Sequence, residues 1–332
     1  MKAFVVDGYG DRTPLRAAQR PVPEVGPHDV LVRVVAAGVN PLDNGIKAGE
    51  FKVPLPYTPP FVLGNDVAGV VEGIGSSVQR FTVGDAVFAR PDKDRIGTFA
   101  EFIAIAEADL AAAPATLSMV EAASLPLVAL TAWQALVERA DVRPGQRVLV
   151  HAGSGGVGTI AIQLAKHLGA EVTTTASARN AELLHSLGAD RVVDHRTEDF
   201  AEVVRDQDVV LDPMGADSVL RSVRVVRPGG LVVGIGGPPD PAFARSLGKP
   251  LLAPVLALTS RRGRAAARRR GVHYSFLFMR ASGDQLREIA ALVDAGVIRP
   301  VVDRTFPFPD TPAALAYVER GRAVGKVVVT VP

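Results

Sequence analysis

The chain has 332 residues, of which 48% are hydrophobic and 22% charged, and its formal net charge is +2. This length predicts two domains of ordinary size, and the composition is typical of a folded protein and not of a disordered one. Cysteine is absent, which excludes disulfides, thiolate catalysis and every zinc site that needs a cysteine ligand.

The sequence predicts neither a membrane span nor a secretory leader. We find no run of the ~18 consecutive apolar residues that a membrane helix needs. The segment after Met1 is strand-like and does not resemble a charged leader followed by a long apolar stretch. We therefore expect a cytoplasmic protein, and its small net charge does not by itself require a polyanionic partner.

The first third of the chain has a β-rich pattern. Short valine-rich runs alternate with turns marked by glycine and proline, which predicts strands at residues 30–35, 67–71, 85–88 and 100–106.

From about Val120 the pattern changes to strands that alternate with helices. The expected strands lie at residues 147–152, 171–177, 191–194, 208–212, 231–235 and 273–279, and the expected helices at 159–167 and 180–187. Strands separated by helices of this length indicate right-handed βαβ units and a parallel sheet. A helix at 311–319 and a closing strand at 326–331 end the chain.

These elements predict an α/β protein. A β-rich domain formed by residues 1–121 and 296–332 is interrupted by a doubly wound parallel-sheet domain at residues 122–295.

A glycine pattern follows the strand at 147–152. Gly153, Gly155 and Gly158 form Gly-x-Gly-x-x-Gly between a strand and a helix. Glycine permits the tight turn, the approach of backbone N–H groups to a pyrophosphate, and close packing of helix on strand. The alternative is a glycine-rich turn without a ligand. The surrounding strand, helix and later strands favour dinucleotide binding, through Gly153, Ser154, Gly155, Gly156, Val157 and Gly158.

The end of the next strand favours NADP(H) over NAD(H). An NAD site has a carboxylate ~20 residues beyond the glycines, where it binds the ribose 2′-hydroxyl. This chain has Ser177 and Arg179 in that region, and both groups can bind a 2′-phosphate through charge-assisted hydrogen bonds. The alternative is that Arg179 is simply solvated at the start of a helix.

Several longer motifs carry a family resemblance. They are residues 37–43 (AGVNPLD), 63–69 (LGNDVAG), 81–87 (FTVGDAV), 97–101 (GTFAE), 130–133 (LTAW) and 325–328 (GKVV), in this order along the chain. Together with the glycine turn they make the chain resemble the medium-chain dehydrogenase/reductase superfamily, and within it the zinc-independent quinone oxidoreductase group.

The resemblance implies a GroES-like catalytic domain formed by both ends of the chain, with a Rossmann domain between them. It implies hydride transfer from NADPH to quinones or to the C=C bond of α,β-unsaturated carbonyl compounds. Many members are dimers or tetramers, and a homodimer is expected here. Zinc-dependent relatives have cysteine in place of Asn40 and histidine in place of Asn65, so no catalytic zinc is expected. Leu42 and Gly45 occupy the positions of the proton relay of alcohol-oxidising relatives, which argues against alcohol oxidation.

The same correspondence gives catalytic-site candidates, which are Asn40, Asp43, Lys47, Tyr57 and Asn65. Asn40 is expected either to contact the nicotinamide ribose or a substrate oxygen, or to support its own turn. Tyr57 either donates a proton or only packs, Asp43 orients its neighbours, and water could be the final acid.

Further cofactor-binding candidates also come from the resemblance. They lie along the carboxyl edge of the sheet or near the nicotinamide and are Thr131, Asp212, Met214, Gly234, Ile235, Phe276, Leu277 and Phe278. The three residues at 276–278 are expected to act through backbone groups. Lys326 either reaches a phosphate or is exposed. His195 stands where relatives often have tyrosine near the adenosine, which leaves its part in 2′-phosphate binding open.

Six arginines lie within residues 261–270. They form either a nucleic-acid patch or an exposed helix between two strands. Alanine and arginine favour a helix, and no aromatic residue interleaves with the run to stack on bases, so the helix is preferred and a nucleic-acid partner is not expected.

Taken together, the sequence predicts an NADP-dependent, zinc-independent quinone oxidoreductase or enone reductase. The alternatives are a dedicated pathway enoyl reductase that acts on an enone or a thioester, and a non-catalytic NADPH- or RNA-binding relative. Residues 51–61 and 238–257 are expected to shape the choice of substrate, and the sequence identifies neither that substrate nor the proton donor.

Overall fold

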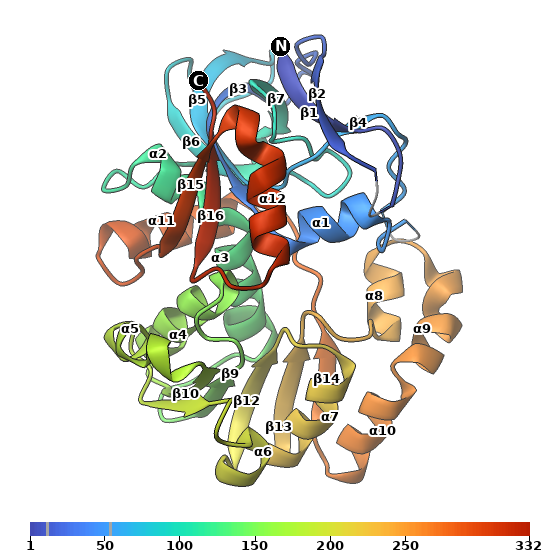
Figure 1. Cartoon of the computed structure of the whole chain (residues 1–332), viewed down its shortest axis with the longest axis vertical. Helices are drawn as coiled ribbons and strands as arrows, with labels where there is room; N and C mark the ends of the chain where they lie inside the picture. Colours follow the sequence, from blue (N-terminus) through green and yellow to red (C-terminus); the bar gives the residue numbers. More distant parts are fainter. Residues whose placement is uncertain (11–12, 53–54) are drawn as a thin grey trace. The chain divides into compact units, whose positions relative to one another are not determined.

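The computed structural model describes residues 1–10, 13–52 and 55–332. The chain forms two compact units, the first made of Met1–Leu130 and Arg280–Pro332 and the second of Thr131–Met279 (Figure 1). The predicted α/β class, with a sheet unit built from both ends of the chain and a parallel-sheet unit between them, is confirmed.

The described part of the first unit contains two sheets. A small antiparallel sheet has the order β2-β1-β4, and a larger one has the order β15-β16-β3-β5-β6-β8, with β7 also paired to β3. The strands are β1 (Lys2–Val6), β2 (Leu15–Gln19), β3 (Asp29–Val39), β4 (Phe61–Val62), β5 (Val67–Ile74), β6 (Ala86–Ala89), β7 (Phe102–Ala106), β8 (Leu110–Ala112), β15 (Val302–Pro307) and β16 (Lys326–Thr330).

Strand β3 is the centre of the larger sheet. Its residues Val30, Val32 and Val34 are all fully buried, as alternation along a strand with one covered face requires. It pairs with β5 along one edge and with β7 and β16 along the other. The β16 register sets Val327 opposite Val39. Residues near the two ends of the chain therefore meet at the end of β3.

The helices of the first unit are α1 (Pro41–Ala48), α2 (Met119–Ala123), α3 (Pro126–Trp133), α11 (Gly283–Asp294) and α12 (Thr311–Glu319), and α3 continues past Leu130 into the second unit. Residues 122–130 and 280–295 thus belong to the first unit, whereas the sequence-based ranges assign them to the other domain. The contacts explain this: a Cβ on Gly283 would lie 2.2 Å from the Leu110 carbonyl oxygen, and the Asp294 carboxylate accepts from the backbone of Thr116 at 3.0 Å. The boundaries of independently folding domains stay a prediction.

The second unit is a parallel sheet with the strand order β11-β10-β9-β12-β13-β14. The strands are β9 (Arg147–Val150), β10 (Glu171–Ala176), β11 (Arg191–Asp194), β12 (Gln207–Asp212), β13 (Val226–Gly234) and β14 (His273–Phe276). Numbered from β9, this is the order 3-2-1-4-5-6 of the doubly wound dinucleotide-binding fold. The predicted final strand at 273–279 is confirmed in position but ends at Phe276.

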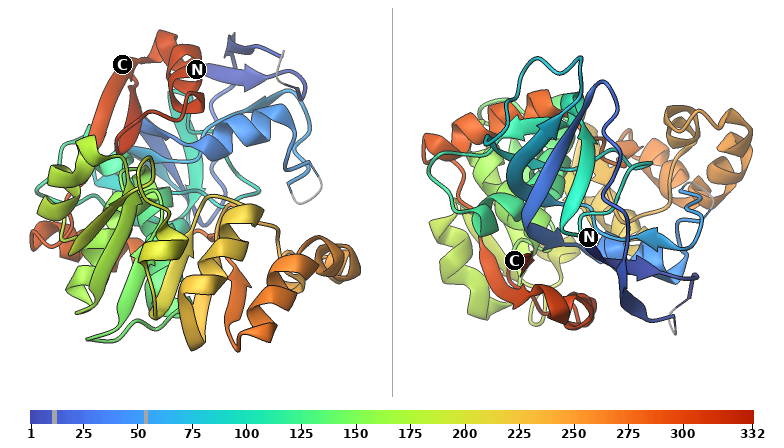
Figure 2. Two further views of the ribbon diagram at one scale, coloured as in Figure 1. Left: turned by 60° about the horizontal axis from the view of Figure 1, so that its bottom comes forward. Right: turned by 90° about the horizontal axis from the view of Figure 1, so that it is seen from above.

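Helices cover this sheet. The helices are α4 (Gly156–His167), α5 (Ala181–Ser186), α6 (Phe200–Val203), α7 (Ala216–Val225), α8 (Pro241–Ser246), α9 (Ala253–Thr259) and α10 (Arg261–Arg269), and a π-helical turn spans Gln134–Arg139. Helix α4 packs on β9 and β10, α7 on β12 and β13, and α10 on β14. Helix α9 contacts α10, and α8 contacts α9, so these three helices extend outward from the β14 edge of the sheet, as the orange helices of Figure 2 show.

The arginine run is the exposed helix that the sequence favours. Gly263 and Ala267 are buried on one side of α10, and a Cβ on Gly263 would lie 3.5 Å from Val219 of α7. Five of the six arginines are exposed on the other side, with Arg264 half-buried. Among the helices that the structure describes, none is long and apolar enough to cross a membrane.

Candidate active site

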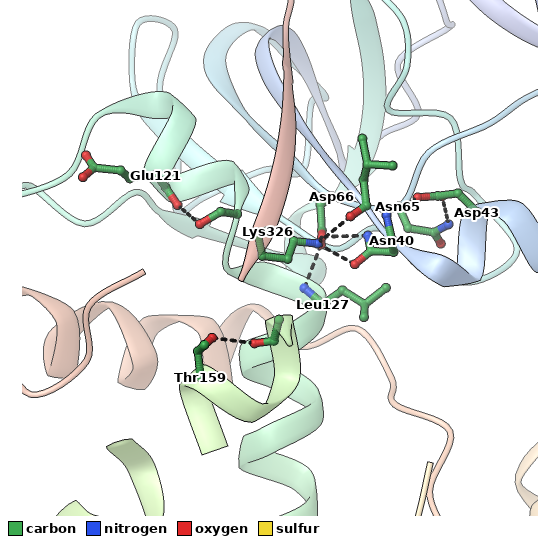
Figure 3. Close-up of polar contacts among 11 residues, drawn as sticks. Asn40, Asp43, Asn65, Asp66, Glu121, Leu127, Thr159 and Lys326 are labelled. Atoms are coloured by element: carbon green, nitrogen blue, oxygen red, sulfur yellow. Dashed lines mark hydrogen bonds and ion pairs between the residues drawn. The ribbon is translucent and has the colours of Figure 1, made fainter. Parts of the chain in front are cut away.

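A network of buried polar side chains lies where β3, β5 and β16 meet (Figure 3). The Lys326 ammonium donates to Asn40 Oδ1 at 2.5 Å, to the Val39 carbonyl oxygen at 3.1 Å and to Asp66 Oδ2 at 3.1 Å. The Asn40 amide donates to the same Asp66 oxygen at 2.9 Å. Each of the three side chains is at least nine-tenths buried. A buried ammonium is therefore balanced by a buried carboxylate.

Local sequence explains this convergence. Asn40 follows β3, Asp66 precedes β5, and Lys326 opens β16, whose register with β3 sets it beside Asn40. Gly38 leaves room for the carboxylate, because a Cβ there would lie 2.9 Å from Asp66 Oδ2 and 2.5 Å from the Ala123 carbonyl oxygen.

Asp43 and Asn65 extend the network. Asn65 Nδ2 donates to Asp43 Oδ1 at 2.7 Å, and the Asn40 backbone N–H donates to Asp43 Oδ2 at 2.7 Å. Asp43 is fully buried, which raises the pKa of its carboxyl to about 7, although its hydrogen bonds to Asn65 and Asn40 act in the opposite direction. Asn40, Asp43, Asn65, Asp66 and Lys326 are called the buried polar network below.

Three of the five catalytic-site candidates, Asn40, Asp43 and Asn65, thus come together, whereas Tyr57 and Lys47 lie apart from them. The Tyr57 hydroxyl donates to the Lys93 carbonyl oxygen at 2.5 Å, and the Tyr57 ring centroid is 5.1 Å from that of Phe61. Burial raises the pKa of Tyr57. Tyr57 lines a cavity of about 340 Å³ formed by residues 56–58, Phe61, Val62, Asp94 and Ile96. Residues 53 and 54 of the predicted substrate loop lie outside the described residues.

The expectation that Lys326 is exposed is wrong, and its contact with a phosphate stays a prediction. The structure buries it at 5% exposure, with its ammonium held by three oxygens of the first unit. Lys47, at the end of α1, is directed at the Thr13 carbonyl oxygen, 3.5 Å away.

In the second unit the predicted glycine turn lies between β9 and α4. A Cβ on Gly153 would lie 2.0 Å from Thr174 Oγ1, and one on Gly158 would lie 2.4 Å from the Ala152 carbonyl oxygen. Ala152 itself adopts a left-handed φ of 52°. Gly155 is the N-cap of α4 and supplies no side-chain hydrogen bond, so no capping side chain competes with an anion for the first N–H groups of the helix. The turn therefore fits a pyrophosphate cradle.

A chain of buried hydrogen bonds, called the histidine chain here, connects this turn to the next strand ends. The Ala152 N–H contacts Thr175 Oγ1 at 3.2 Å, His151 Nδ1 lies 3.0 Å from that oxygen, and His151 Nε2 lies 3.0 Å from Ser222 Oγ. Ser222 in turn donates to Asp212 Oδ2 at 2.7 Å.

The donor and the acceptor can be assigned for each hydrogen bond of the histidine chain. The Asp212 carboxylate accepts from Ser222, so Ser222 accepts from His151 Nε2–H, and His151 Nδ1 accepts from the Thr175 hydroxyl. This arrangement requires a neutral imidazole, and burial lowers the pKa of His151. The sequence analysis overlooked His151, Ser222 and Asp66. The available signals were that Asp66 lies within the quoted motif 63–69 and that His151 lies two residues before the glycine turn.

Other cofactor-side candidates lie at the carboxyl ends of the strands. Asp212 Oδ1 accepts from the Met214 N–H at 2.9 Å, and the Ile235 N–H donates to the Asp212 carbonyl oxygen at 3.0 Å. Met214 is 63% exposed, and Gly234 ends β13. Thr131 is buried within α3.

Two of the backbone N–H groups of residues 276–278, which were expected to contact the nicotinamide, are already used within the second unit. The Phe276 N–H donates to Asp240 Oδ2 at 2.9 Å and the Leu277 N–H to the Gly234 carbonyl oxygen at 2.9 Å. Phe278 stacks near Phe243, with ring centroids 5.4 Å apart.

The candidates for the 2′-phosphate lie at the ends of β10 and β11. Ser177 is half-buried and Arg179 is exposed just after β10, and the His195 N–H donates to the Ala176 carbonyl oxygen at 3.2 Å. Strand pairing sets Asp194 beside Ala176, and the Asp194 carboxylate accepts from the Arg196 N–H at 3.0 Å. Basic side chains thus follow both strands at this edge.

Within the described ranges, no group of three or more His, Cys, Asp or Glu side chains is arranged to hold a metal ion. The fold and the glycine cradle define an oxidoreductase of the two-domain type, with a Rossmann-like unit and a GroES-like unit.

Comparison with known proteins identifies the family. Residues 26–115 match the family described as "Alcohol dehydrogenase GroES-like domain", and residues 187–329 match "Zinc-binding dehydrogenase". The chain is 36% identical over 357 residues to "NAD(P)H oxidoreductase RTN4IP1, mitochondrial" of Mus musculus, with 100% of this chain and 89% of the relative covered. It is 35% identical over 343 residues to "NADPH-dependent alkenal/one oxidoreductase, chloroplastic" of Arabidopsis thaliana, covering 99% and 79%.

Solved structures that are similar to this chain include oxidoreductases of the same kind. The quinone oxidoreductase from Coxiella burnetii has a TM-score of 0.87 at 31% identity, with 100% of this chain and 99% of that chain covered. The CurK enoyl reductase has a TM-score of 0.83 at 28% identity (100% and 99% covered), and the mycobacterial protein Rv1454c complexed with NADPH has 0.82 at 29% identity (99% of each). The chain belongs to the quinone oxidoreductase group of the medium-chain dehydrogenase/reductase superfamily, as its motifs predict.

Proposed function

We propose that this protein uses NADPH to reduce quinones or the C=C bond of α,β-unsaturated carbonyl compounds, and that it does so without zinc. The names of the relatives from Arabidopsis thaliana and Coxiella burnetii support this substrate class. The observation that carries the proposal is the buried polar network. In it two amides, Asn40 and Asn65, stand at the positions where zinc-dependent relatives have a cysteine and a histidine.

Each amide is committed to a neighbouring carboxylate. Asn40 Nδ2 donates to Asp66 and Asn65 Nδ2 donates to Asp43. The Lys326 ammonium contacts Asn40 Oδ1 and Asp66, so a positive charge is already present where a metal-binding relative would need room for a cation. A carboxamide is also a poor ligand for zinc compared with thiolate or imidazole.

Bound NADPH supplies the hydride, and the chain's own residues bind and orient the reactants. The glycine cradle and the N-terminus of α4 hold the pyrophosphate. Ser177 and Arg179 bind the 2′-phosphate, with His195 beside them. Asn40, held in one orientation by Lys326 and Asp66, presents a fixed amide to the nicotinamide ribose or the substrate, and Asp43 orients Asn65. Positioning of this kind can remove ~7–11 kcal/mol of barrier.

The function is tested by NADPH consumption with 9,10-phenanthrenequinone, 1,4-benzoquinone and small enones. We expect turnover with at least one class, unchanged after exhaustive chelation, and less than one zinc per four chains. Stoichiometric metal that is lost together with activity would contradict zinc independence. Inertness towards the whole panel would instead favour a binding protein.

A dedicated enoyl reductase is the second candidate, because the CurK enoyl reductase is similar over the whole chain. An enoyl thioester distinguishes the two: a kcat/KM for the thioester at least a hundredfold above that for any quinone or small enone would favour the enoyl reductase.

Three further expectations remain proposals. A homodimer is tested by sedimentation, and the absence of a nucleic-acid partner by retention on RNA at low salt. A cytoplasmic location is tested by fractionation, since the two relatives carry "mitochondrial" and "chloroplastic" in their names.

A further inference from the structure

Large apolar side chains are exposed on α9 and on the short 3₁₀ turn Pro250–Leu252 before it. Leu251 is 91% exposed, Val255 58% and Leu258 67%. Their spacing of four and then three residues sets them on one side of the helix. A single exposed leucine is ordinary, but a row of three apolar side chains is typical of a contact surface. The three residues are called the apolar stripe below.

Helical hydrogen bonding continues from α9 into α10 through Ser260. The Ser260 N–H donates to the Leu256 carbonyl oxygen at 3.1 Å, and the Ser260 carbonyl oxygen accepts from the Arg264 N–H at 3.0 Å. This is the pattern of an α-helix. The buried side follows the same period, since Ser260, Gly263 and Ala267 are all buried. The opposite side of α9 and α10 therefore forms one exposed surface at the periphery of the second unit (Figures 1 and 2).

Exposed arginines extend the apolar stripe along α10. Arg261 and Arg262 follow Leu258 by three and four residues, and Arg268 and Arg269 follow those two by seven. Such spacings keep side chains on one side of a helix, and all four arginines are exposed. They are called the arginine row below.

The arginine row belongs to a segment without negative charge. Residues 241–283 contain nine arginines and lysines and no aspartate or glutamate, whereas the rest of the chain has 28 basic and 35 acidic residues. The small net charge of the chain thus hides a strongly positive segment on a negative remainder.

The charges of the arginine row are not neutralised within the described residues. None of its four side chains forms an ion pair or a hydrogen bond there, whereas the neighbouring Arg270 donates to the Arg224 carbonyl oxygen at 3.1 Å. Four guanidinium groups are therefore available to an anionic partner.

Apolar and basic side chains on one surface are typical of helices that lie in the boundary between a membrane and water. There the apolar side chains enter between the lipid headgroups, and arginines bind the headgroup phosphates with their stems along the apolar boundary. Each basic residue near an anionic bilayer strengthens binding roughly fivefold.

Two other partners fit this surface less well. A nucleic acid would use the arginine row but not the apolar stripe, and residues 244–272 contain no aromatic side chain on which a base could stack. A second copy of the chain, related by a two-fold axis, would bring the same positive segment against itself with no acidic residue in either copy of that segment to compensate.

We propose that the apolar stripe and the arginine row form a docking surface for an anionic lipid bilayer. Leu251, Val255 and Leu258 enter the headgroup boundary, and the arginine row binds the headgroup phosphates. The chain lies on the bilayer and does not span it. The surface assigns no reaction to the protein and does not depend on the proposed reductase activity.

The test is flotation of the full chain with two kinds of vesicle, one of pure phosphatidylcholine and one with about 30% phosphatidylserine. We expect at least tenfold tighter binding to the anionic vesicles at about 0.1 M sodium chloride, and weaker binding as the salt concentration rises.

Two combined variants separate the two parts of the surface. The charge variant, with Arg261→Gln, Arg262→Gln, Arg268→Gln and Arg269→Gln, should bind anionic vesicles at least a hundredfold more weakly, as the loss of four charges implies. The stripe variant, with Leu251→Ser, Val255→Ser and Leu258→Ser, should bind at least tenfold more weakly and keep the salt dependence.

Matched controls change the same residue types elsewhere. One replaces the exposed Arg143, Arg205, Arg320 and Arg322 by Gln, and the other replaces the exposed Val22, Ile74 and Val83 by Ser. Both should bind anionic vesicles as the wild type does.

A single label tests the contact even if a combined variant does not fold. Because the chain has no cysteine, Val255→Cys and Val83→Cys each provide one site for an environment-sensitive fluorophore. We expect a blue shift on anionic vesicles for the label at position 255 and none at position 83.

The proposal is overturned if the wild type does not bind anionic vesicles, if it binds neutral vesicles equally well, or if either combined variant binds fully. An unshifted label at position 255 would also contradict it. Transfer RNA bound more tightly than the vesicles would assign the arginine row to a nucleic acid instead. A wild-type dimer that the stripe variant converts to a monomer would assign the stripe to a second copy.

Discussion

Asp43 is a fully buried carboxyl group whose hydrogen-bond donors, Asn40 and Asn65, are both neutral. Its pKa is raised from 3.8 to about 7. The folded protein therefore binds a proton that the unfolded chain has lost above pH 4. This group stabilises the fold below that pH, and its contribution is lost as the pH rises through 7.

We predict that Asp43→Asn removes this pH dependence. In the wild type the group lowers the free energy of unfolding by up to about 1.4 kcal/mol per pH unit between pH 4 and 7. Asparagine keeps an acceptor for the Asn40 N–H without the charge. Urea unfolding at half-unit steps from pH 5 to 8 measures the difference between the two proteins.

Asp190→Asn is the control for that series. Asp190 accepts from Lys166 and from the Val172 N–H, and its pKa is lowered. Its contribution is therefore lost only as the pH falls below about 4, so Asp190→Asn should leave the slope between pH 5 and 8 unchanged. Parallel curves for wild type and Asp43→Asn would show that Asp43 stays ionised.

A second prediction for a single residue concerns Arg179. Because it is the exposed cation that follows β10, Arg179→Ala should weaken NADPH binding about 10- to 150-fold, the loss expected for a charge-assisted hydrogen bond of roughly 1.5–3 kcal/mol. NADH lacks the 2′-phosphate, so its affinity should hardly change. Calorimetric titration of both cofactors measures this, and equal weakening of both would mean that Arg179 only supports the fold.

At the scale of elements, the histidine chain ties the ends of β9, β10 and β12 to α7. We predict that His151→Phe lowers the free energy of unfolding by about 1–3 kcal/mol, because Ser222 and Thr175 each lose a buried hydrogen-bond partner. The phenyl ring can keep the edge contact with Phe200, whose centroid is 4.4 Å from the imidazole. NADPH affinity should fall as well, since Ala152 in the glycine turn is held through Thr175.

Chemical denaturation and cofactor titration of His151→Phe measure these two effects. His185→Phe is a control, because His185 Nδ1 contacts the Ala189 carbonyl oxygen, away from the glycine turn. A loss of stability with NADPH affinity unchanged would show that the histidine chain does not position the turn.

Elements set by local patterns were predictable, and those set by distant contacts were not. The glycine turn, the alternation of β9 to β12 with helices, and α12 all follow from periodicity and glycine stops. Helix α1 was missed because its sequence PLDNGIKA is poor in helix formers, and its start depends on Asp43 accepting from the Asn40 N–H.

In the candidate site, too, local motifs were predictable and distant contacts were not. Family motifs pointed to Asn40, Asp43 and Asn65, but no local pattern indicates that Lys326 joins them, because that contact spans 286 residues. No sequence pattern indicated that Arg90 is buried at 1% exposure, because arginine is usually exposed.

At the scale of the whole molecule, the two units contain buried groups that respond to acid in opposite ways. Protonation of Asp43 stabilises the first unit as the pH falls from 7 to 5. The pKa of His151 is lowered below 6.5, so the second unit loses stability as the pH falls below that value.

We predict that hydrogen-exchange protection of residues 131–279, corrected for the intrinsic rate, decreases at pH 5 relative to the first unit. Asp43→Asn should remove the gain of the first unit, and His151→Phe the loss of the second. Protection that changes alike in both units and in both variants would contradict this prediction.

The position of β16 also bears on how the chain folds during synthesis. Strand β3 is made early, whereas β16, which covers its edge at residues 36–39 and supplies Lys326, is made after the whole second unit. At 5–20 residues per second the ribosome needs on the order of ten seconds or more for that interval. Throughout it, Asp66 lacks its ammonium partner and β3 exposes unpaired backbone groups, which are templates for aggregation. The second unit, being continuous, can fold meanwhile, so dependence on chaperones should be concentrated in the first unit and should end only when the last strand emerges.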